Sequence, residues 1–360
     1  MAEGVRLYAG TQHGLFVWRA RNGGWEETAR EFPDHIVDVL AGDRRRPERV
    51  YAAVTHDALY RTDDAGRHWT RLLAGDVRAV TVDPSDERVV YAGTAPVHLY
   101  RSEDGGDTWE ELPALLELPE EVRKRWWTPY APHTGHVRDI FVHPDDPNTL
   151  YLCLEHGGIV RSLDRGASWQ DVSGGIDWVD MHSLGCLPGS RSRYYTASAK
   201  GFYTSDDPAQ GWVRAERGMT RDYFNTLLFL PSPRAGAPAT MLVGAADGVP
   251  SAWRREERGA RSAVFRSDDA AESWYRVGKG LPDEMDAMIW HLTPHPNDPN
   301  AVFGGVGAID RGDPLAPTVR SAPGVCDGPG QVILSRDRGE SWERLDLTLP
   351  ADRVLWAATD

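Results

Sequence analysis

A short pattern between Ser102 and Trp109 recurs along the chain and constrains the fold more than any other feature. It places Asp104 two residues after Ser102, Gly106 two residues further on, and then Thr-Trp. The Asp carboxylate can accept hydrogen bonds from the backbone N–H groups of its own turn, and glycine supplies the positive φ that such a turn needs. Trp109 then gives a large apolar surface for packing. The pattern predicts a β-hairpin.

Copies of this pattern, which we call Asp turns, divide the chain into seven units, each anchored by a tryptophan. Three further copies keep the same spelling: Thr62/Asp64/Gly66/Trp69, Ser162/Asp164/Gly166/Trp169 and Ser335/Asp337/Gly339/Trp342. Two are looser: Ser205/Asp207/Trp212 and Ser267/Asp269/Ser273/Trp274. The seventh ends at Trp25 and lacks the Asp.

Each unit contains four short β segments. Residues 77–82, 90–93 and 99–102 precede Trp109 and are rich in Val, Leu and Tyr, with an Asp-Pro turn after the first segment. Such segments, bounded by Gly, Asp and Pro, are typical of strands, and four strands repeated seven times are typical of a propeller. We therefore expect an all-β chain, with residues 1–360 forming a single seven-bladed β-propeller of four-stranded blades. Only residues 115–126 favour a short helix.

The two chain ends predict how the ring closes. The first unit begins at a second strand, residues 7–10, and so lacks its innermost strand. The last segment, residues 353–359, has the apolar pattern of an innermost strand with nothing after it. We expect this C-terminal strand to complete the first blade, which leaves fewer open sheet edges.

The Asp turns resemble the Asp-box, or bacterial neuraminidase repeat, of sialidases, sortilin-type receptors, some xyloglucanases and photosystem assembly factors. The resemblance implies a propeller in which the box is a structural turn on the rim, away from the ligand, so we expect no catalytic role for these residues. A sialidase also has an Arg-Ile-Pro motif near its start, three carboxylate-binding arginines and a Tyr/Glu pair. This chain has no such N-terminal motif and no pair that can be placed, so a sialidase is not expected.

Composition narrows the classes of partner. A net charge of −14 disfavours nucleic acid and anionic membrane surfaces as partners. The three cysteines are widely spaced, which disfavours a disulfide scaffold and fits a reducing compartment. The N-terminus has no signal-peptide pattern, and no stretch is long and apolar enough to span a bilayer. We expect a cytoplasmic protein.

Three long connections indicate where binding occurs. They cover residues 113–136, 247–261 and 307–329, and the repeat register places all three on the face opposite the Asp turns. Long loops on a rigid scaffold commonly carry function. Trp126, Trp127 and Tyr130 in the first suit stacking on a sugar or an aromatic ligand, and equally suit a lid packed on its own blade.

A column of mostly polar residues stands near the start of the innermost strands, where it should line the mouth of the central channel: Asp38, Arg78, Arg138, His182, Asn225 and Trp290. Arginines can bind a carboxylate or phosphate in bidentate fashion, so Arg78 and Arg138, with Asn225, are candidate ligand-binding residues. Asp38 and His182 are the candidates for proton transfer.

Nothing in the sequence requires a cofactor, but a divalent metal at the channel mouth stays open. Imidazoles converging from separate blades could hold one, and the candidates are His56, His136, His156 and His182. Ordinary solvated or hydrogen-bonded loop histidines are the alternative.

Two functions follow, and the sequence leaves both open. The first is a propeller that binds a small polar or anionic ligand, carbohydrate-like or otherwise, or a partner protein, on the loop-bearing face. The second is a hydrolase or lyase acting there on a glycoside or another anionic small molecule. Arg78 and Arg138 would orient its substrate, and Asp38 and His182 would transfer protons. Clustering of these four residues around one pocket, within hydrogen-bond reach, would favour the enzyme. A flat, wet channel with exposed insertion loops would favour binding.

Overall fold

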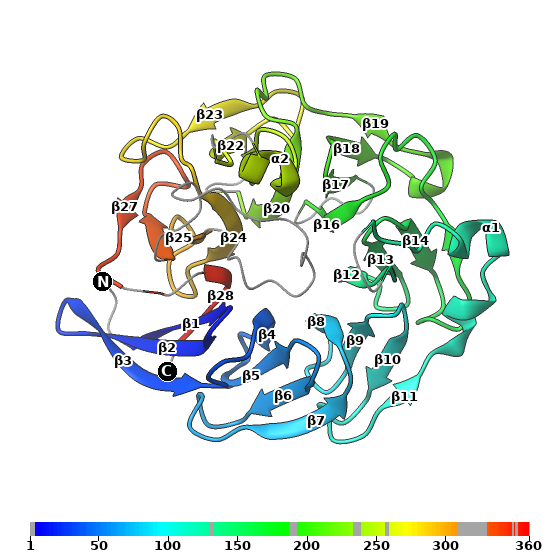
Figure 1. The fold of residues 1–360 in the computed structure, drawn as a ribbon, viewed down its shortest axis with the longest axis horizontal. Helices are drawn as coiled ribbons and strands as arrows, with labels where there is room; N and C mark the ends of the chain where they lie inside the picture. The colour runs from blue at the N-terminus through cyan, green and yellow to red at the C-terminus, as the bar shows by residue number, and fades with distance from the viewer. Residues whose placement is uncertain are drawn as a thin grey trace.

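Seven four-stranded antiparallel sheets surround a central channel in the computed structural model, as the sequence predicts (Figure 1). The structure describes residues 4–129, 133–187, 193–232, 239–255, 259–307, 330–347, 349 and 352–359. We number the blades 1–7 in the order in which their outer strands occur along the chain.

Every blade has four strand positions, which run from the channel outward. Beside the channel lie β28 (Asp352–Thr359), β4 (Val37–Asp43), β8 (Val77–Val82), β12 (Val137–Val142), β16 (Met181–Cys186), β20 (Tyr223–Leu230) and β24 (Met288–Pro294). The second strands are β1 (Val5–Thr11), β5 (Arg46–Val54), β9 (Val90–Thr94), β13 (Leu150–Leu154), β17 (Tyr194–Ser198), β21 (Thr240–Ala246) and β25 (Val302–Gly307). The third are β2 (Gly14–Arg21), β6 (Ala58–Thr62), β10 (Leu99–Ser102), β14 (Gly158–Ser162), β18 (Gly201–Ser205), β22 (Ala263–Ser267) and β26 (Gln331–Ser335). The outermost are β3 (Gly24–Glu31), β7 (Thr70–Ala74), β11 (Glu110–Glu111), β15 (Gln170–Asp171), β19 (Val213–Arg214), β23 (Tyr275–Val277) and β27 (Glu343–Arg344).

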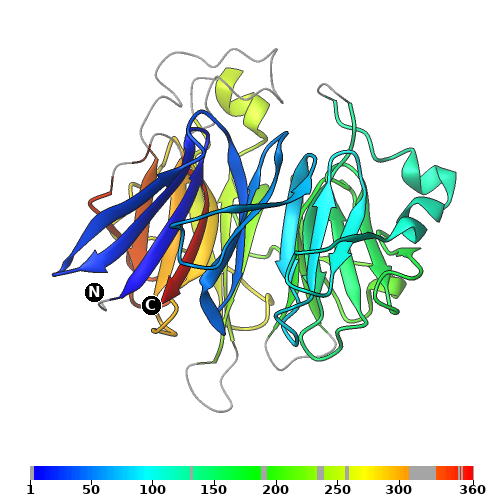
Figure 2. The same cartoon turned by 90° about the horizontal axis from the view of Figure 1, so that it is seen from below.

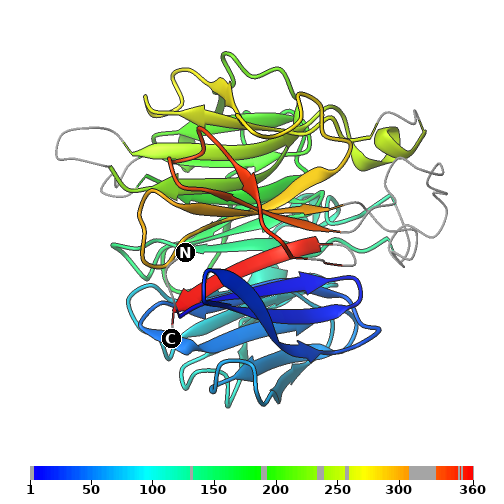
Figure 3. The same ribbon diagram turned by 90° about the vertical axis from the view of Figure 1, so that its left-hand side faces the viewer.

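The C-terminal strand closes the ring. β28 pairs antiparallel with β1, from Val5↔Thr359 to Thr11↔Asp352, and so supplies the innermost strand of blade 1. Figure 3 shows this red strand lying beside the blue strands of the N-terminal blade. The closure expected from the two chain ends is therefore confirmed.

The core lies between neighbouring blades. The second strands β9, β13 and β17 are buried along their whole length because each is covered on both faces by adjacent sheets, whereas β3, β7 and β11 are largely exposed. This accounts for the unbroken apolar runs of the second strands. Close packing also selects small residues: a Cβ on Gly93 would lie 2.4 Å from the Cβ of Val137 in the next blade.

Hydrogen bonds between loops define the two ends of the ring. At one end, the Asp turns bond to the first-to-second-strand connections, as in Gly105 N–H to Arg88 O (2.7 Å) and Arg165 N–H to Asn148 O (2.9 Å). We call this the turn end. At the other end, the second-to-third-strand hairpins bond to the segments that enter the innermost strands, as in Glu155 N–H to His136 O (3.0 Å). We call this the mouth end.

The Asp turns form the hydrogen bonds that their sequence predicts. The Oδ1 atom of Asp104 accepts from the Ser102 hydroxyl (2.8 Å) and the Thr108 N–H (2.9 Å), while Gly106 donates its N–H to the Ser102 oxygen (2.7 Å). Similar networks occur at Asp64, Asp164, Asp269 and Asp337. The looser copy at Asp207 differs, because its carboxylate caps the 3-10 helix η2 (Pro208–Gln210) instead.

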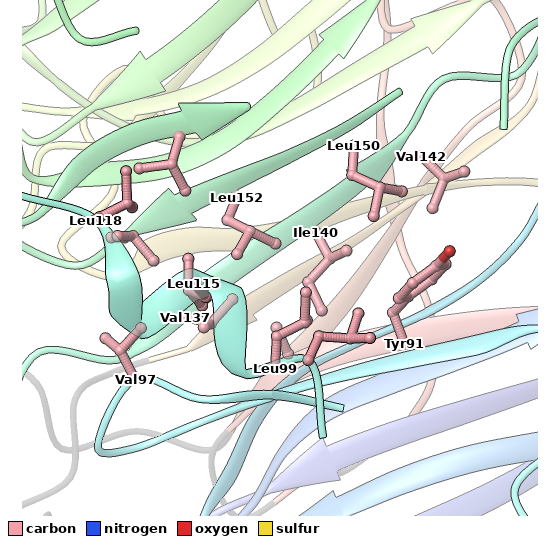
Figure 4. Close-up of a cluster of buried hydrophobic side chains, with 14 of the residues drawn as sticks. Tyr91, Val97, Leu99, Leu115, Leu118, Val137, Ile140, Val142, Leu150 and Leu152 are labelled. Atoms are coloured by element: carbon pink, nitrogen blue, oxygen red, sulfur yellow. The ribbon is translucent and has the colours of Figure 1, made fainter. Parts of the chain in front are cut away.

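Helical structure is sparse and departs from the sequence expectation. Where one helix was expected over residues 115–126, the chain forms η1 (Pro113–Glu117) and α1 (Glu120–Arg123), and no pattern in the sequence indicated α2 (Pro250–Arg255). Leu115 and Leu118 pack into the cluster between blades 3 and 4, beside Leu99 and Ile140 (Figure 4). The start of the first insertion thus seals two blades on the outer side, whereas α2 stands at the mouth end (Figure 2).

None of the described helices has the length and apolar character needed to cross a bilayer.

Candidate functional site at the channel mouth

A β-bulge near the start of every innermost strand forms a ring at the mouth end. In blade 3, Val77 pairs with Thr94 and Ala79 with Gly93, so Arg78 is the extra residue opposite no partner. A bulge bends its strand and re-aims the side chain that it carries. Equivalent bulges occur in the other six blades, at Asp38, Arg138, His182, Asn225, Trp290 and Arg353. Six of these seven residues form the polar column found in the sequence.

The central channel forms a pocket of about 470 Å³. Five of the predicted site residues line this one pocket: Asp38, Arg78, Arg138, His182 and Asn225. Trp290 and His291 also line it. The four residues on which the enzyme hypothesis depends thus share a pocket, but hydrogen-bond reach joins only two of them, Arg78 and Asp38, among the described contacts. Arg138 bonds to Asn225 instead, and His182 bonds to the Phe224 carbonyl.

Arg78 belongs to a closed ion-pair triad. Its guanidinium lies 2.9 Å from Asp76 and 3.2 Å from Asp38, and its side chain is only 5% exposed. Thr55 donates a further hydrogen bond to Asp38 at 3.2 Å. The charge of Arg78 is thus balanced by protein carboxylates, which leaves it little capacity for an anionic ligand.

Arg138 has donor capacity left over. It donates one hydrogen bond, from Nη2 to the Asn225 Oδ1 atom (3.4 Å), and its Nε lies 3.8 Å from Glu155 Oε2. Asn225 is oriented in turn by donating to the Trp290 carbonyl (2.6 Å). Burial disfavours the charge on Arg138, but Glu155 and the surrounding acidic groups hold its pKa above the ordinary value. Arg138 is therefore a permanent cation at the mouth.

His182 is a neutral base with a fixed tautomer. Its Nδ1 lies 2.6 Å from the Phe224 carbonyl, which can only accept, so Nδ1 carries the proton and Nε2 is left as an acceptor. Burial lowers the pKa of His182 to about 4. Nε2 lies 3.8 Å from Asp180, whose own pKa is raised by burial.

The four candidate metal-ligating histidines do not converge on one point. His56 is half exposed and lies beside Asp76 (3.1 Å), while His136 lies 3.9 Å from Glu155 and has its pKa lowered to about 4 by burial. His156 lies 3.7 Å from Asp180. Within the described ranges, one group combines close metal-ligating atoms, and it consists of Glu155, His156 and Asp180.

The aromatic candidates of the first insertion behave differently from one another. Trp126 packs against the core cluster of blades 3 and 4, as a structural residue would. Trp127 is 52% exposed and stacks on His133, with ring centroids 5.4 Å apart. Tyr130, and the third insertion from residue 308 to 329, lie outside the described residues.

Three further acidic residues lie at the mouth and were not predicted from the sequence: Asp76, Glu155 and Asp180. Asp76 and Asp180 each stand two residues before a bulge residue, Arg78 and His182 respectively. Aligning the residues at this position across the repeats could have found them. Glu155 lies on a hairpin tip, and only the closed ring shows that it adjoins Arg138.

Comparison with known proteins agrees with this architecture. No protein-family model matches the sequence. The chain is 25% identical over 233 residues to an oligoxyloglucan-reducing end-specific xyloglucanase from Emericella nidulans, and the match covers 62% of this chain and 25% of the fungal protein. The chain therefore spans about a quarter of the length of that relative.

Two solved structures are similar in fold. The GH74 xyloglucanase from Xanthomonas campestris superposes with a TM-score of 0.58 at 17% identity, covering 95% of this chain and 66% of that one. YCF48 bound to D1 peptide superposes with a TM-score of 0.53 at 16% identity, covering 90% of this chain and 91% of that one. Likenesses at this identity show the propeller fold, and that fold occurs in a GH74 xyloglucanase and in a protein with a bound peptide.

Proposed function

We propose that this propeller binds a small, carboxylated and hydroxylated ligand, such as a sugar acid, at the mouth end of its channel. Arg138 carries the proposal. Of the two ring arginines whose side chains the structure describes, Arg78 is held by two carboxylates in close contact and Arg138 is not. The planar fork of Arg138 suits a carboxylate. Ser183 supports the assignment, because its buried hydroxyl makes no hydrogen bond to any described residue and lines the same pocket.

The rim fits a ligand of this kind. Trp127 is exposed but does not line the pocket itself. It belongs to the insertion that leads through His136 into the mouth end, and aromatic faces stack well on sugar rings. The carbohydrate-active relatives also favour a sugar, while the peptide-bound neighbour makes a partner protein the other candidate occupant.

Binding can be measured by calorimetric titration with D-glucuronate, D-galacturonate and glucose 6-phosphate, with glucose as the neutral comparison. We expect the acids to bind and glucose to bind at least tenfold more weakly. Arg138→Ala should weaken binding of the acids by about 10- to 100-fold, since a charge-assisted hydrogen bond contributes roughly 1.5–3 kcal/mol.

Arg161→Ala is the matched control. Arg161 lies on β14 of the same blade but pairs with Asp207 (3.4 Å) and Gln170 (3.2 Å), away from the channel. Its loss should leave affinity unchanged. Failure of all three acids to bind the wild-type protein, or equal binding by Arg138→Ala, contradicts the proposal.

Hydrolysis of a glycoside at the same mouth is the second candidate, and the fungal xyloglucanase relative is the observation that favours it. Asp38 is already engaged by Arg78 and Thr55, so proton transfer would fall on Nε2 of His182. Release of reducing ends from xyloglucan oligosaccharides, abolished in His182→Gln, would support an enzyme. No release by the wild-type protein rejects this candidate.

A further inference from the structure

Two pairs of neighbouring blades carry the same local arrangement at the mouth end. Between blades 2 and 3, His56 sits at a hairpin tip with φ of 60° and contacts Asp76 at 3.1 Å. Between blades 4 and 5, His156 sits at the equivalent tip with φ of 55° and approaches Asp180 at 3.7 Å. Each Asp carbonyl accepts the backbone N–H that follows the next second strand, from Ala95 and Ala199.

The two arrangements differ in the bulge residue that follows the Asp. After Asp76 this residue is Arg78, which contacts the Asp76 carboxylate at 2.9 Å, so the protein supplies its own cation. After Asp180 the residue is His182, at 3.8 Å. No Lys or Arg of the described part of the chain forms an ion pair with Asp180.

The result is a pair of facing acceptors. Asp180 is more than nine-tenths buried, and its Oδ1 makes no hydrogen bond to a described residue. His182 donates from Nδ1 to the Phe224 carbonyl, so the lone pair of Nε2 is what faces Asp180. A buried carboxylate is costly unless it is paired or coordinates a metal. Two acceptors that face each other favour a cation between them.

Glu155 and His156 lie beside Asp180 and add two further groups that can bind a metal ion. One ligand atom from each of Glu155, His156 and Asp180 lies within 4.8 Å of the other two. We propose a binding site for one divalent transition-metal ion between blades 4 and 5, held by Glu155, His156 and Asp180. His182, whose Nε2 lies 3.8 Å from Asp180, is the candidate fourth ligand. Two imidazole nitrogens and two carboxylate oxygens suit a first-row ion such as Zn²⁺ or Mn²⁺ better than Mg²⁺ or Ca²⁺, which prefer oxygen alone.

The site adjoins the proposed ligand site but does not depend on it. Glu155 is 3.8 Å from Arg138, so a metal ion would lie beside the group that binds the anion. Metal binding can be measured with no organic ligand present. Arg138→Ala should keep it, which separates failure of this inference from failure of the proposed function.

The test is calorimetric titration of EDTA-treated, dialysed protein with ZnCl₂ and, separately, MnCl₂. We expect one ion per chain for at least one of the two metals. Asp180→Asn should lower that affinity by more than tenfold, because loss of even an outer-sphere partner commonly costs 10- to 100-fold.

His182→Arg is the second variant, because it reproduces at Asp180 the Asp–Arg pair that Asp76 and Arg78 form in blade 3. The arginine would neutralise Asp180, so this variant still tests the site if Asp180→Asn fails to fold. It should abolish binding while circular dichroism shows a folded propeller. His56→Ala, at the matched position of the closed triad, should bind as the wild type does. No binding of either ion by wild-type protein, or equal affinity in Asp180→Asn or in folded His182→Arg, overturns the site.

Discussion

The hydroxyl of Tyr51 in blade 2 donates a hydrogen bond to the Gly105 carbonyl in the Asp turn of blade 3, at 2.8 Å. Arg61 donates to the same carbonyl at 2.7 Å and pairs with Asp107. The Asp turn therefore serves as a contact between blades, and its residues are engaged in holding the turn end together. This agrees with the structural role that the resemblance to the Asp-box implies for these turns.

Tyr51→Phe should lower the free energy of unfolding by about 1–2 kcal/mol, because it leaves a buried carbonyl with one donor fewer. Urea denaturation measures the change. Tyr100→Phe is the control, since no hydrogen bond of its hydroxyl is described on the half-buried strand β10. Equal stability of Tyr51→Phe and the wild type would show that the contact between blades contributes nothing.

Gly280→Ala should be strongly destabilising. Gly280 has φ of 94°, and a Cβ there would lie 2.3 Å from the Trp342 carbonyl oxygen of the Asp turn in blade 7. The left-handed backbone costs an alanine roughly 1–2 kcal/mol, and the collision adds about as much again.

Gly23→Ala is the control that distinguishes the strain of the left-handed backbone from the collision of a Cβ with the Trp342 carbonyl. Gly23 also has a positive φ, of 78°, but a Cβ there meets nothing within 4 Å. Gly23→Ala should cost only about 1 kcal/mol. Similar losses in urea denaturation for the two variants would show that the junction between blades has room for a side chain.

Acid should weaken the Asp turns. Hydrogen bonds from the Thr108 side chain and backbone, and from Ser102, hold the pKa of Asp104 far below its usual value of 3.8. As the pH falls below 3.8, the unfolded chain takes up a proton that the folded turn does not bind, so the stabilisation present above that pH is progressively lost.

Asp104→Asn keeps an acceptor oxygen but cannot titrate. Its urea midpoint should lie below that of the wild type at pH 7, and the two midpoints should converge as the pH falls from about 4 toward about 2. Parallel pH curves for the two proteins would contradict the depressed pKa of Asp104.

A second pH effect should come from the channel. Burial lowers the pKa of His291 from 6.5 to about 4. Between those values the unfolded chain binds a proton that the folded state does not, so stability falls as the pH drops from 6.5 to about 4. The slope of the unfolding free energy against pH reports how many more protons the unfolded chain binds than the folded one. With EDTA present, His291→Gln should lower that number near pH 5 by about one. An unchanged slope would contradict this.

The sequence predicted the fold and most of the mouth ring because both depend on local repetition. The bulge residues Arg78, Arg138 and His182 could be aligned, since each follows the same turn by the same register. Their partners could not be aligned. Glu155 meets Arg138, and Asp180 meets His156, across hairpins and blades whose loops differ in length. Pairings of this kind appear only when the ring has closed.

The position of the first insertion was also only partly predictable from the sequence. Its length predicted a loop on the binding face, but Leu115 and Val122 are buried between blades 3 and 4. A few apolar residues in a loop are compatible with a loop that covers the binding face and with one that packs between two blades. Which of the two forms depends on the space between the outer strands of the neighbouring blades, and the sequence does not show that space.

Hydrogen exchange with and without saturating D-glucuronate tests most directly whether binding belongs to the mouth end. We expect protection in the peptides that enter the inner strands, around residues 136–138, 180–182 and 222–225. Exchange should be unchanged at the Asp turns 102–109 and 162–169. Protection at the Asp turns, with none around Arg138, would contradict binding at the mouth end.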